Sequence, residues 1–481
     1  LKSMSQISSA SNYSRSALRE FMQDLREALS GSERDFTQIP LGKAILLLSV
    51  PMVLEMIMES VFALVDIFFV SRLGAEAVAT VGITESLMTI IYAIGMGLSV
   101  GTTALVSRRI GEKRPEQASM AAVQAIFTGV LVSLLFSATG IFFAKDLLRL
   151  MGASETTVEN NYLYPALMLG GNGVIMLLFI INAVFRSSGD AAISMRVLWF
   201  ANILNIVLDP LLIFGPGPFP ELGVTGAAVA TNIGRGTAVV YQLFLLGRGR
   251  YRVKITAGQV VIRLKEIIKL VKLSLGAIGQ NLIATSSWIF LVWVVTSLGE
   301  EVVAGYTIAI RIVMFVLLPS WGMANAAATL VGQNLGAKKP GRAERSAWVV
   351  GIGNMVFLGL LSIIFIAAPE SFIRFFVDGL EEPMVMQSGI TCLRVISFGF
   401  LVYAMGMVMV NSINGAGDTT TPVWINFIAF WLMEIPLAYL FTVVFDLHIN
   451  GVCYAILIGE SALTLISMLI FMRGRWKLKE V

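Results

Sequence analysis

The chain has 481 residues, of which 56% are hydrophobic and only 14% are charged, and its formal net charge is +4. An average soluble domain is about 25% charged, and a soluble fold with this composition would expose large apolar patches. The composition therefore excludes a water-soluble globular protein, and we expect no nucleic-acid partner. The single histidine, His448, also excludes a multi-histidine metal site.

Residues 1–40 are polar and contain no compact apolar stretch, so we expect a cytoplasmic tail without a cleavable signal peptide. Apolar residues recur at helical spacing from Leu18 to Leu29, a pattern typical of an amphipathic helix at a membrane surface. A tail with only a weak helical tendency would show the same pattern, so both interpretations stay open.

Twelve apolar segments follow Pro40, each long enough for the roughly 20 residues that a helix needs to cross a bilayer. We predict helices because segments of this length exceed the strands of a membrane barrel. The segments are 44–70, 78–106, 119–144, 161–185, 192–214, 223–246, 267–297, 303–332, 346–368, 388–412, 421–445 and 450–472.

Basic residues in the loops predict the orientation of these spans. Lys and Arg are concentrated in the N-terminal tail, in the loops that follow the second, fourth, sixth and eighth segments, and at the C-terminal end. The loops on the other side of the membrane hold only Arg72, Lys145, Arg149 and Arg374. Because basic loops stay on the cytoplasmic side, both termini are predicted to be cytoplasmic. We expect a multi-pass protein of the plasma membrane, the inner membrane of a prokaryote, surrounded by membrane lipids.

The two halves of the chain resemble one another at a nearly constant spacing. Most matches lie 225 residues apart and one lies 228 apart: Phe69–Gly74 with Val294–Gly299, Leu105–Pro115 with Leu330–Pro340, Gly226 with Gly451, and Gly189-Asp190 with Gly417-Asp418. Each half contains six spans, an even number, so both halves enter the membrane in the same orientation. The predicted fold class is an all-α membrane protein built from two parallel six-helix repeats.

This duplication predicts the domain organisation. An N-lobe covers residues 41–247 and a C-lobe covers 267–472, with a basic cytoplasmic linker over 248–266 and a C-terminal tail over 473–481. A cavity between two such bundles suits transport by alternating access.

Charged residues inside spans are expensive and usually face a cavity or a partner. The first segment carries three acids on one helical face, at about 100° per residue: Glu55, Glu59 and Asp66. The fifth segment carries a second polar stripe: Asn202, Asn205 and Asp209. Both stripes belong to the N-lobe.

The second half has lost the acids of the first segment, because the spacing of 225 places Gln280, Ala284 and Leu291 opposite them. This asymmetry predicts a cation site in the N-lobe alone. A carboxylate in a low-dielectric site can take and release a proton near neutral pH. Carboxylates with amide and hydroxyl oxygens can equally bind Na⁺, so H⁺ and Na⁺ both stay open.

Pro51 removes one backbone hydrogen bond from the first helix, so that helix either kinks during function or is permanently bent. Three further acids lie in or near spans: Glu85, Glu434 and Glu460. They are candidates to bind a cationic compound, or they cap helices or pair with the span residues Arg235, Arg311 and Arg394.

The run Gly415–Asp418 has the Gly-x-Gly-Asp form of intramembrane aspartyl proteases. Its repeat partner, Ser187–Asp190, ends on the same Gly-Asp pair in the equivalent turn. An Asp that caps the following helix explains both copies. We therefore predict that the protein is not an enzyme.

The chain resembles the multidrug and toxic compound extrusion (MATE) family, which shares a superfamily with lipid-linked oligosaccharide flippases. The resemblance extends from residue 40 to about residue 472. Besides the two six-helix repeats, it rests on Pro51, Leu64–Gly74, Asn182–Asp190, Asn202 to Asp209-Pro210, and Gly226–Thr231.

The resemblance implies a V-shaped antiporter that exports small organic compounds, often cationic drugs, in exchange for Na⁺ or H⁺. It implies Asp66 and Asp209 as the principal carboxylates, with Asn205, Asn182 and Thr231 as supporting ligands. Na⁺, where it is the coupling ion, would bind at Asp66, Asp209 and Asn205. Glu85, Gln280, Asn281 and Glu434 are the expected substrate contacts. We expect a monomer without a cofactor.

A flippase of the same superfamily is the alternative function. Such a protein should present several Arg or Lys residues to its central cavity and often has two extra helices. This chain has only Arg235, Arg311 and Arg394 within its spans and twelve apolar segments, which favours export of small compounds.

Overall fold

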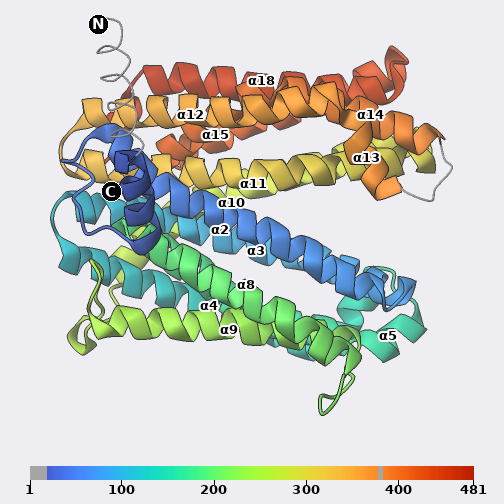
Figure 1. The fold of residues 1–481 in the computed structure, drawn as a ribbon, viewed down its shortest axis with the longest axis horizontal. Helices are drawn as coiled ribbons and strands as arrows, with labels where there is room; N and C mark the ends of the chain where they lie inside the picture. Colours follow the sequence, from blue (N-terminus) through green and yellow to red (C-terminus); the bar gives the residue numbers. More distant parts are fainter. Residues whose placement is uncertain (1–18, 378–382) are drawn as a thin grey trace, which may run out of the picture.

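The computed structural model describes residues 19–377 and 383–481, and these ranges are largely helical (Figure 1). Residues 19–30 form a helix that exposes Phe21, Met22 and Leu29. Leu18, where the predicted amphipathic pattern begins, lies outside the described residues, as does the rest of the tail before it.

The helices of the N-terminal half follow the predicted segments closely. They are α2 (Leu41–Ser71), α3 (Ala75–Gly111), α4 (Pro115–Leu150), α6 (Leu163–Gly170) with α7 (Asn172–Ser188), α8 (Ala191–Phe214) and α9 (Val224–Arg248). The short helix α5 (Glu155–Asn161) joins α4 to α6.

The C-terminal half repeats this order. Its helices are α10 (Leu264–Thr296), α11 (Glu300–Gly336), α12 (Pro340–Ala367), α14 (Pro383–Phe398) with α15 (Phe400–Gly415), α16 (Thr420–Asn426) continuing through η2 (Phe427–Glu434), α17 (Ile435–Tyr439) and η3 (Leu440–Val444), and α18 (His448–Met472). Three short helices lie outside the spans: η1 (Ala257–Gln259), α13 (Pro369–Val377) and η4 (Arg475–Leu478).

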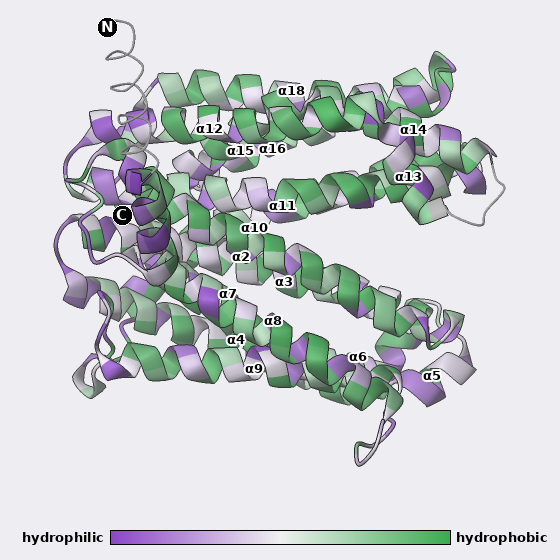
Figure 2. Cartoon of the chain, viewed as in Figure 1, coloured by the Kyte–Doolittle hydropathy of each residue, from purple (hydrophilic) through white to green (hydrophobic). Residues whose placement is uncertain are grey.

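Within the described residues, nine helices are long and apolar enough to cross a membrane, and the pair α14 and α15 makes a tenth. The helices α2 and α9, 31 and 25 residues long, run alongside them and complete twelve spans. Apolar residues fill the middle of the bundle, and polar residues gather at its ends (Figure 2). The predicted fold class is confirmed.

Two spans depart from the regular helices that the sequence predicted. The tenth span, expected as one segment over 388–412, bends by 57° between α14 and α15. Gly399 lies at this bend, where a Cβ atom would come within 2.3 Å of the Tyr403 ring. The eleventh span contains two π-helical stretches, η2 and η3, which apolar periodicity does not reveal.

The twelve spans form two lobes that approach each other at one end and diverge at the other, giving the V shape of Figure 1. The end where they approach also holds the linker between α9 and α10 and the C-terminus. We call it the basic end, because Lys and Arg concentrate in its loops: Arg108, Arg109, Lys113, Arg114, Lys338 and Lys339.

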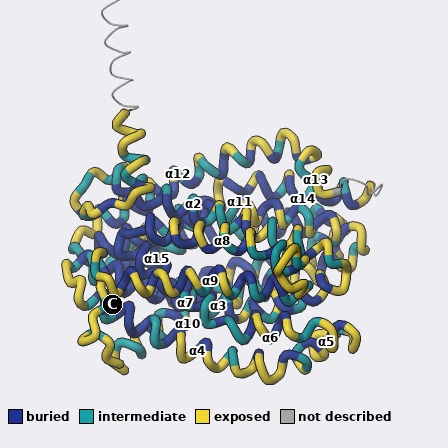
Figure 3. The backbone as a smooth tube through the Cα atoms, turned by 60° about the horizontal axis from the view of Figure 1, so that its bottom comes forward, coloured by how far each residue is buried: buried dark blue, intermediate teal, exposed yellow. Residues whose placement is uncertain are grey.

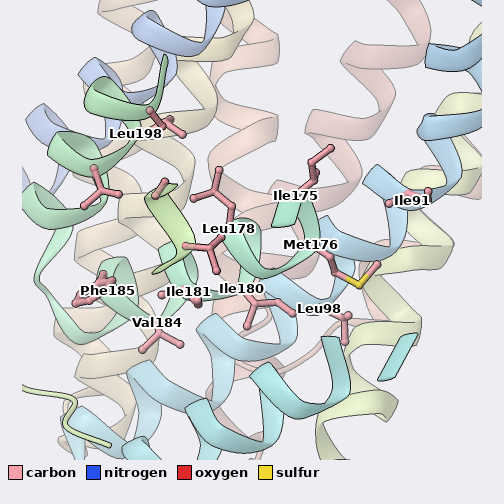
Figure 4. Close-up of a cluster of buried hydrophobic side chains, with 14 of the residues drawn as sticks. Ile91, Leu98, Ile175, Met176, Leu178, Ile180, Ile181, Val184, Phe185 and Leu198 are labelled. Atoms are coloured by element: carbon pink, nitrogen blue, oxygen red, sulfur yellow. The ribbon is translucent and has the colours of Figure 1, made fainter. Parts of the chain in front are cut away.

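The N-lobe has one core cluster and the C-lobe has two, and a fourth cluster joins the lobes near the basic end. In the N-lobe, apolar side chains of α7 pack between α3 and α8 (Figure 4). The joining cluster includes Phe36, Leu48 and Met52 from the N-terminal side and Ala327 and Leu330 from α11. Buried residues fill the interior, and exposed ones lie on the outer surface (Figure 3).

The contact between the lobes follows the predicted duplication. Helix α10 packs on α3, and its counterpart α2 packs on α11. Gly97 of α3 faces Ile278, whose Cγ1 would lie 2.3 Å from an added Cβ, and Gly322 faces the Met52 carbonyl at 2.6 Å in the same way. These glycines lie 225 residues apart, so they are equivalent in the two repeats. At each crossing, the lack of a Cβ atom lets the two helices approach closely.

Candidate functional site

Asp209 lies at the centre of a polar network in the N-lobe. It is fully buried on α8, one helical turn after Asn205. With the Asn205 amide oriented to suit both of its neighbours, Nδ2 donates to Asp209 Oδ2 at 2.7 Å. The Asn205 Oδ1 atom then accepts from the hydroxyl and the backbone N–H of Thr231 on α9, at 3.1 and 2.9 Å. The structure thus brings together Asp209, Asn205 and Thr231.

The second carboxylate oxygen of Asp209 has no hydrogen-bond partner among the described residues, although it is buried. A buried carboxylate oxygen without a partner is costly, because it has lost its water. A bound proton would remove that cost, and a cation coordinated there would offset it. The Asp209 site therefore fits a proton or a small cation.

Asp66 of α2 lies within electrostatic range of Asp209 and Glu85, and we call these three acids and their immediate surroundings the N-lobe pocket. Asp66 is partly exposed, its charge repels those of Asp209 and Glu85, and Arg235 attracts it. No hydrogen bond to the Asp66 carboxylate is formed by the described residues. Tyr92 and Tyr164 lie within electrostatic range of the Asp66 and Glu85 carboxylates.

The donor set bears on the identity of the cation. No group of three or more His, Cys, Asp or Glu side chains in the described ranges is placed to hold a metal ion. A Na⁺ ion shared by Asp66 and Asp209 would therefore depend on amide and hydroxyl oxygens for its other ligands. A proton needs only one carboxylate oxygen.

Glu59 of α2 binds two partners on neighbouring helices. Its Oε1 accepts a hydrogen bond from Arg235 Nη2 of α9 at 2.9 Å, and Oε2 accepts from Asn202 Nδ2 of α8 at 3.1 Å. The pair with Arg235 places a guanidinium beside the acidic pocket. Glu59 is thus paired with Arg235. Asp66, Asp209 and Glu85 are the carboxylates of this cluster that form no ion pair with a described residue.

Glu55 has a different environment from Glu59. It is fully buried, and it accepts from Arg186 Nη1 of α7 and from the Ser194 hydroxyl of α8, each at 2.8 Å. Both carboxylate oxygens are therefore bound. This side chain ties α2 to two helices of its lobe and has no oxygen left for a ligand of its own.

Asn182 does not join the Asp209 network. Its Oδ1 accepts from Gln242 Nε2 of α9 at 2.6 Å. Gln242 and Thr231 are eleven residues apart on α9, so at 1.5 Å per residue they are separated by about 16 Å along the helix. Asn182 therefore lies nearer the basic end than Asp209 does.

The expected substrate contacts are spread over both lobes. Glu85 is exposed on α3 beside Asp66. Gln280 of α10 is buried and exchanges hydrogen bonds of 3.0 Å with Asn414. Asn281 donates to the Ala93 carbonyl of α3 at 3.5 Å, and Glu434 is buried within the C-lobe. Of these four, only Glu85 lies at the N-lobe pocket.

Sequence reasoning did not identify the partners of the first-helix acids. Arg186, the partner of Glu55, lies in the last turn of α7 and is largely buried. Arg235 was considered as a partner of other acids, and its carboxylate is Glu59. An Arg inside a span is itself a signal for a nearby carboxylate, but the sequence does not show which one.

At the basic end, two equivalent side chains link the lobes. Arg108 of α3 donates from Nη2 to the Ala416 carbonyl of the C-lobe at 3.1 Å. Gln333 of α11 donates from Nε2 to the Ser187 carbonyl of the N-lobe at 2.8 Å. A cavity of about 770 Å³ lies beside this contact, and seven of its sixteen lining residues are Lys or Arg.

Comparisons with known proteins agree with this arrangement. The family model MatE matches residues 51–211 and 277–440, one match in each repeat. The probable multidrug resistance protein NorM of Thermotoga maritima is 24% identical over 449 residues, which cover 91% of this chain and 94% of that protein. An FAD transporter of Shewanella oneidensis is 29% identical over 324 residues, covering 67% of this chain and 72% of the relative.

Solved structures show the same fold. One, described as the outward-facing conformation of a multidrug resistance MATE family transporter, superposes with a TM-score of 0.86 and 26% identity. The match covers 92% of this chain and 98% of that one. The family model matches well over half of the sequence and falls on both repeats. The chain therefore belongs to the MATE family and is a multidrug-efflux type of membrane transporter, not an enzyme.

Proposed function

We propose that this protein is a secondary active antiporter that exports small organic compounds, preferentially cations, in exchange for H⁺ or Na⁺. The observation that carries the proposal is the Oδ1 atom of Asp209, which is buried without a hydrogen-bond partner among the described residues and lies within electrostatic range of Asp66. A cation is needed to make this pair of carboxylates stable in the membrane. Export of the organic compound is coupled to entry of H⁺ or Na⁺ if the two compete for binding to these carboxylates.

Charge supports a cationic substrate. The pocket contains Asp66, Asp209 and the exposed Glu85, whereas its guanidinium, Arg235, is already paired with Glu59. An organic cation gains from this imbalance, and an anion such as a flavin nucleotide is repelled by it. One relative is named as an FAD transporter. Because FAD is an anion, we do not extend this substrate to the present protein, and we infer that substrates vary among similar proteins.

Transport would proceed through two states of the N-lobe. Protonation of Asp209, or a cation bound to it, neutralises the pocket and weakens its hold on a cationic compound. Helix α2 is continuous through Pro51, where a backbone hydrogen bond is missing, so bending there costs less than elsewhere. Bending of α2 would move Asp66 and reduce the space left for the compound.

The basic end is assigned to the cytoplasm, because basic loops stay on that side of the membrane. The divergent end of the V then faces outward, and both termini lie in the cytoplasm. We expect a monomer in the plasma membrane, since each lobe buries its own core and the pocket needs no residue from a second copy.

The flippase alternative requires basic side chains that are free to bind a pyrophosphate. Arg235 is engaged by Glu59 and Arg186 by Glu55. These pairs leave the N-lobe pocket acidic. The described geometry therefore supports export of small compounds over flipping of a pyrophosphate-linked sugar.

Efflux from vesicles tests the proposal. A fluorescent organic cation is loaded, and its transport is driven separately by a Na⁺ gradient and by a pH gradient. Asp66→Asn and Asp209→Asn are compared with the wild type and with Glu221→Gln, which removes an exposed loop carboxylate. We expect both Asn variants to lose gradient-driven transport and the control to keep it. Wild-type transport by both Asn variants under either gradient would refute the coupling site.

A further inference from the structure

Glu434 is buried in the C-lobe at the end of the π-helical stretch η2. Helix α18 passes beside it at Gly459, where an added Cβ would lie 2.7 Å from both the Cβ and the Oε2 of Glu434. Gly459 therefore makes the space that the carboxyl group occupies. The next residue on α18 is Glu460, which is partly exposed, and the two carboxylates repel each other.

The same arrangement exists in the N-lobe with different side chains. Gly234 of α9 is the repeat partner of Gly459, and it faces Asn205 of α8 with an added Cβ 3.2 Å from the Asn205 Cβ. Glu434 therefore occupies the position in the C-lobe that corresponds to Asn205, the hydrogen-bond donor to Asp209. Glu460 follows its glycine as Arg235 follows Gly234. The C-lobe thus has carboxylates where the N-lobe has an amide and a guanidinium.

An inserted residue accompanies this change. The turns before α8 and α16 match at a spacing of 228, as in Asp190 and Asp418. The contacts made by the glycines give a spacing of 229 for Asn205 and Glu434. Insertion of one residue into an α-helix produces a π-bulge, which often marks a functional position. The stretch η2 lies where this insertion falls.

Buried hydroxyl groups without partners surround the two acids. The phenols of Tyr306 and Tyr403 are buried with no hydrogen-bond partner in the described ranges, and both lie within electrostatic range of Glu434. The buried hydroxyl of Ser287 on α10 lies within hydrogen-bonding reach of the Glu434 carboxyl. Unsatisfied hydroxyls around a carboxyl group point to a ligand that completes the network.

No Lys or Arg among the described residues forms an ion pair with Glu434 or Glu460. Two neighbouring carboxylates without a counter-ion cannot both stay charged in a low-dielectric site. No group of three metal-binding side chains exists in the described parts of the chain, so a metal ion here would have to take its other ligands from hydroxyl and carbonyl oxygens. The smallest cation that satisfies both acids is a proton.

We propose that Glu434 and Glu460 form a second proton site, located in the C-lobe and separate from Asp209. The pair holds one proton and one negative charge, and the partly exposed Glu460 exchanges the proton with its surroundings. This inference deepens the proposed function, on which it rests, by adding a proton-binding step in the lobe that the sequence had excluded. It predicts proton binding that persists when Asp209 is neutralised.

The other titratable side chains within electrostatic range of the pair are the phenols of Tyr306 on α11 and Tyr403 on α15, and no Lys, Arg or His of the described residues pairs with it. The contacting residue of α10 is Ser287, which does not titrate. Titration of the pair is therefore expected without interference from a neighbouring charge.

Infrared difference spectroscopy on the purified full-length protein in nanodiscs tests this proposal. The carbonyl band of protonated carboxyl groups is followed as pH changes, for the wild type, Glu434→Gln, Glu460→Gln and Asp209→Asn. The matched control, Glu301→Gln, removes an exposed acid of the same lobe. We expect each C-lobe variant to lose the same component of the band, and Asp209→Asn to lose a different one. The control should lose neither.

A second variant keeps both carboxyl groups. Gly459→Ala places a methyl group against Glu434 Oε2, so it should shift the frequency of the C-lobe component without removing it. The proposal is refuted if the band is unchanged in both Gln variants, or if Na⁺ at constant pH displaces the wild-type component. If the wild type shows no C-lobe component but its efflux depends on Asp209, this site is refuted and the proposed function stands. If the C-lobe component is present but efflux does not depend on Asp66 and Asp209, the proposed function is refuted and this site stands.

Discussion

Arg108 of α3 and Gln333 of α11 occupy equivalent positions in the two repeats, and each donates a hydrogen bond to a backbone carbonyl of the opposite lobe. The acceptors, Ala416 and Ser187, also lie in equivalent turns. The lobes are therefore held together at the basic end by a symmetric pair of contacts. An alternating-access cycle has to break both contacts before that end can open.

Removal of the Gln333 contact should favour opening of the basic end. Gln333→Leu removes one hydrogen bond worth about 1 kcal/mol, which changes a two-state population about fivefold. Spin labels at Glu116→Cys and Arg345→Cys, both exposed, would report longer distances between the lobes. Gln117→Leu, on the exposed start of α4, is the control. An unchanged distance distribution in Gln333→Leu would show that the contact does not restrain the lobes.

The buried pair of Glu55 and Arg186 should contribute mainly to stability. Glu55→Leu leaves the Arg186 guanidinium buried without its carboxylate, which costs about 3–5 kcal/mol. The double variant Glu55→Leu/Arg186→Met should be more stable than the sum of the single losses predicts. Thermal unfolding of the purified variants in detergent measures this coupling. Strictly additive losses would mean that the two charges do not depend on each other.

The repeat and the helices could be predicted from the sequence because both depend on local patterns. Apolar length located the spans, and matches at a spacing of 225 revealed the repeat; Gly97 and Gly322 share this spacing, but their equivalent close contacts became visible only in the structure. The three-residue change in spacing was visible too. The single residue added around η2, which changes the spacing from 228 to 229, lies beyond that point and was not predicted.

The site was only partly predictable, because partners far apart in sequence decide which acids remain free. Glu55, Glu59 and Asp66 share one face of α2, and nothing in that pattern distinguishes them. The distinction comes from Arg186 and Arg235, which bind the first two and not the third. The C-lobe acids Glu434 and Glu460 were noted, but no coupling site was predicted from them because the comparison between repeats looked for acids in α10, whereas these lie on η2 and α18.

Asn205 and Thr231 should differ in their effect on coupling. Asn205→Leu removes the donor to Asp209 Oδ2, and a hydrogen bond to a charged group is worth about 1.5–3 kcal/mol. The apparent affinity for the coupling cation should then change about tenfold or more. Thr231→Val leaves the backbone N–H of residue 231 bound to Asn205, so its effect should be smaller. Efflux measured over a range of cation concentrations ranks the two; a larger effect of Thr231→Val would contradict this network.

The segment over residues 31–39, here the N-terminal strap, crosses the basic end and is bound by both lobes. Lys113 of the N-lobe pairs with Asp35. From the C-lobe, Lys339 donates to the Thr37 carbonyl at 2.9 Å and Arg342 to the Phe36 carbonyl at 3.1 Å. Burial acts to raise the pKa of Asp35, but hydrogen bonds from Lys113 and Thr37 outweigh it and hold that pKa below 3.8.

This strap should stay bound at neutral pH and loosen only in acid. A depressed carboxyl pKa stabilises the bound state fully above the ordinary Asp value of about 3.9, and the contribution is lost as pH falls through the lower value. Asp35→Asn should therefore increase hydrogen exchange of residues 36–39 at pH 7, where the wild type stays protected. Glu33→Gln, which alters the strap's other acid, is the control. Equal protection in Asp35→Asn and the wild type would show that the carbonyl contacts of Lys339 and Arg342 hold the strap without the ion pair.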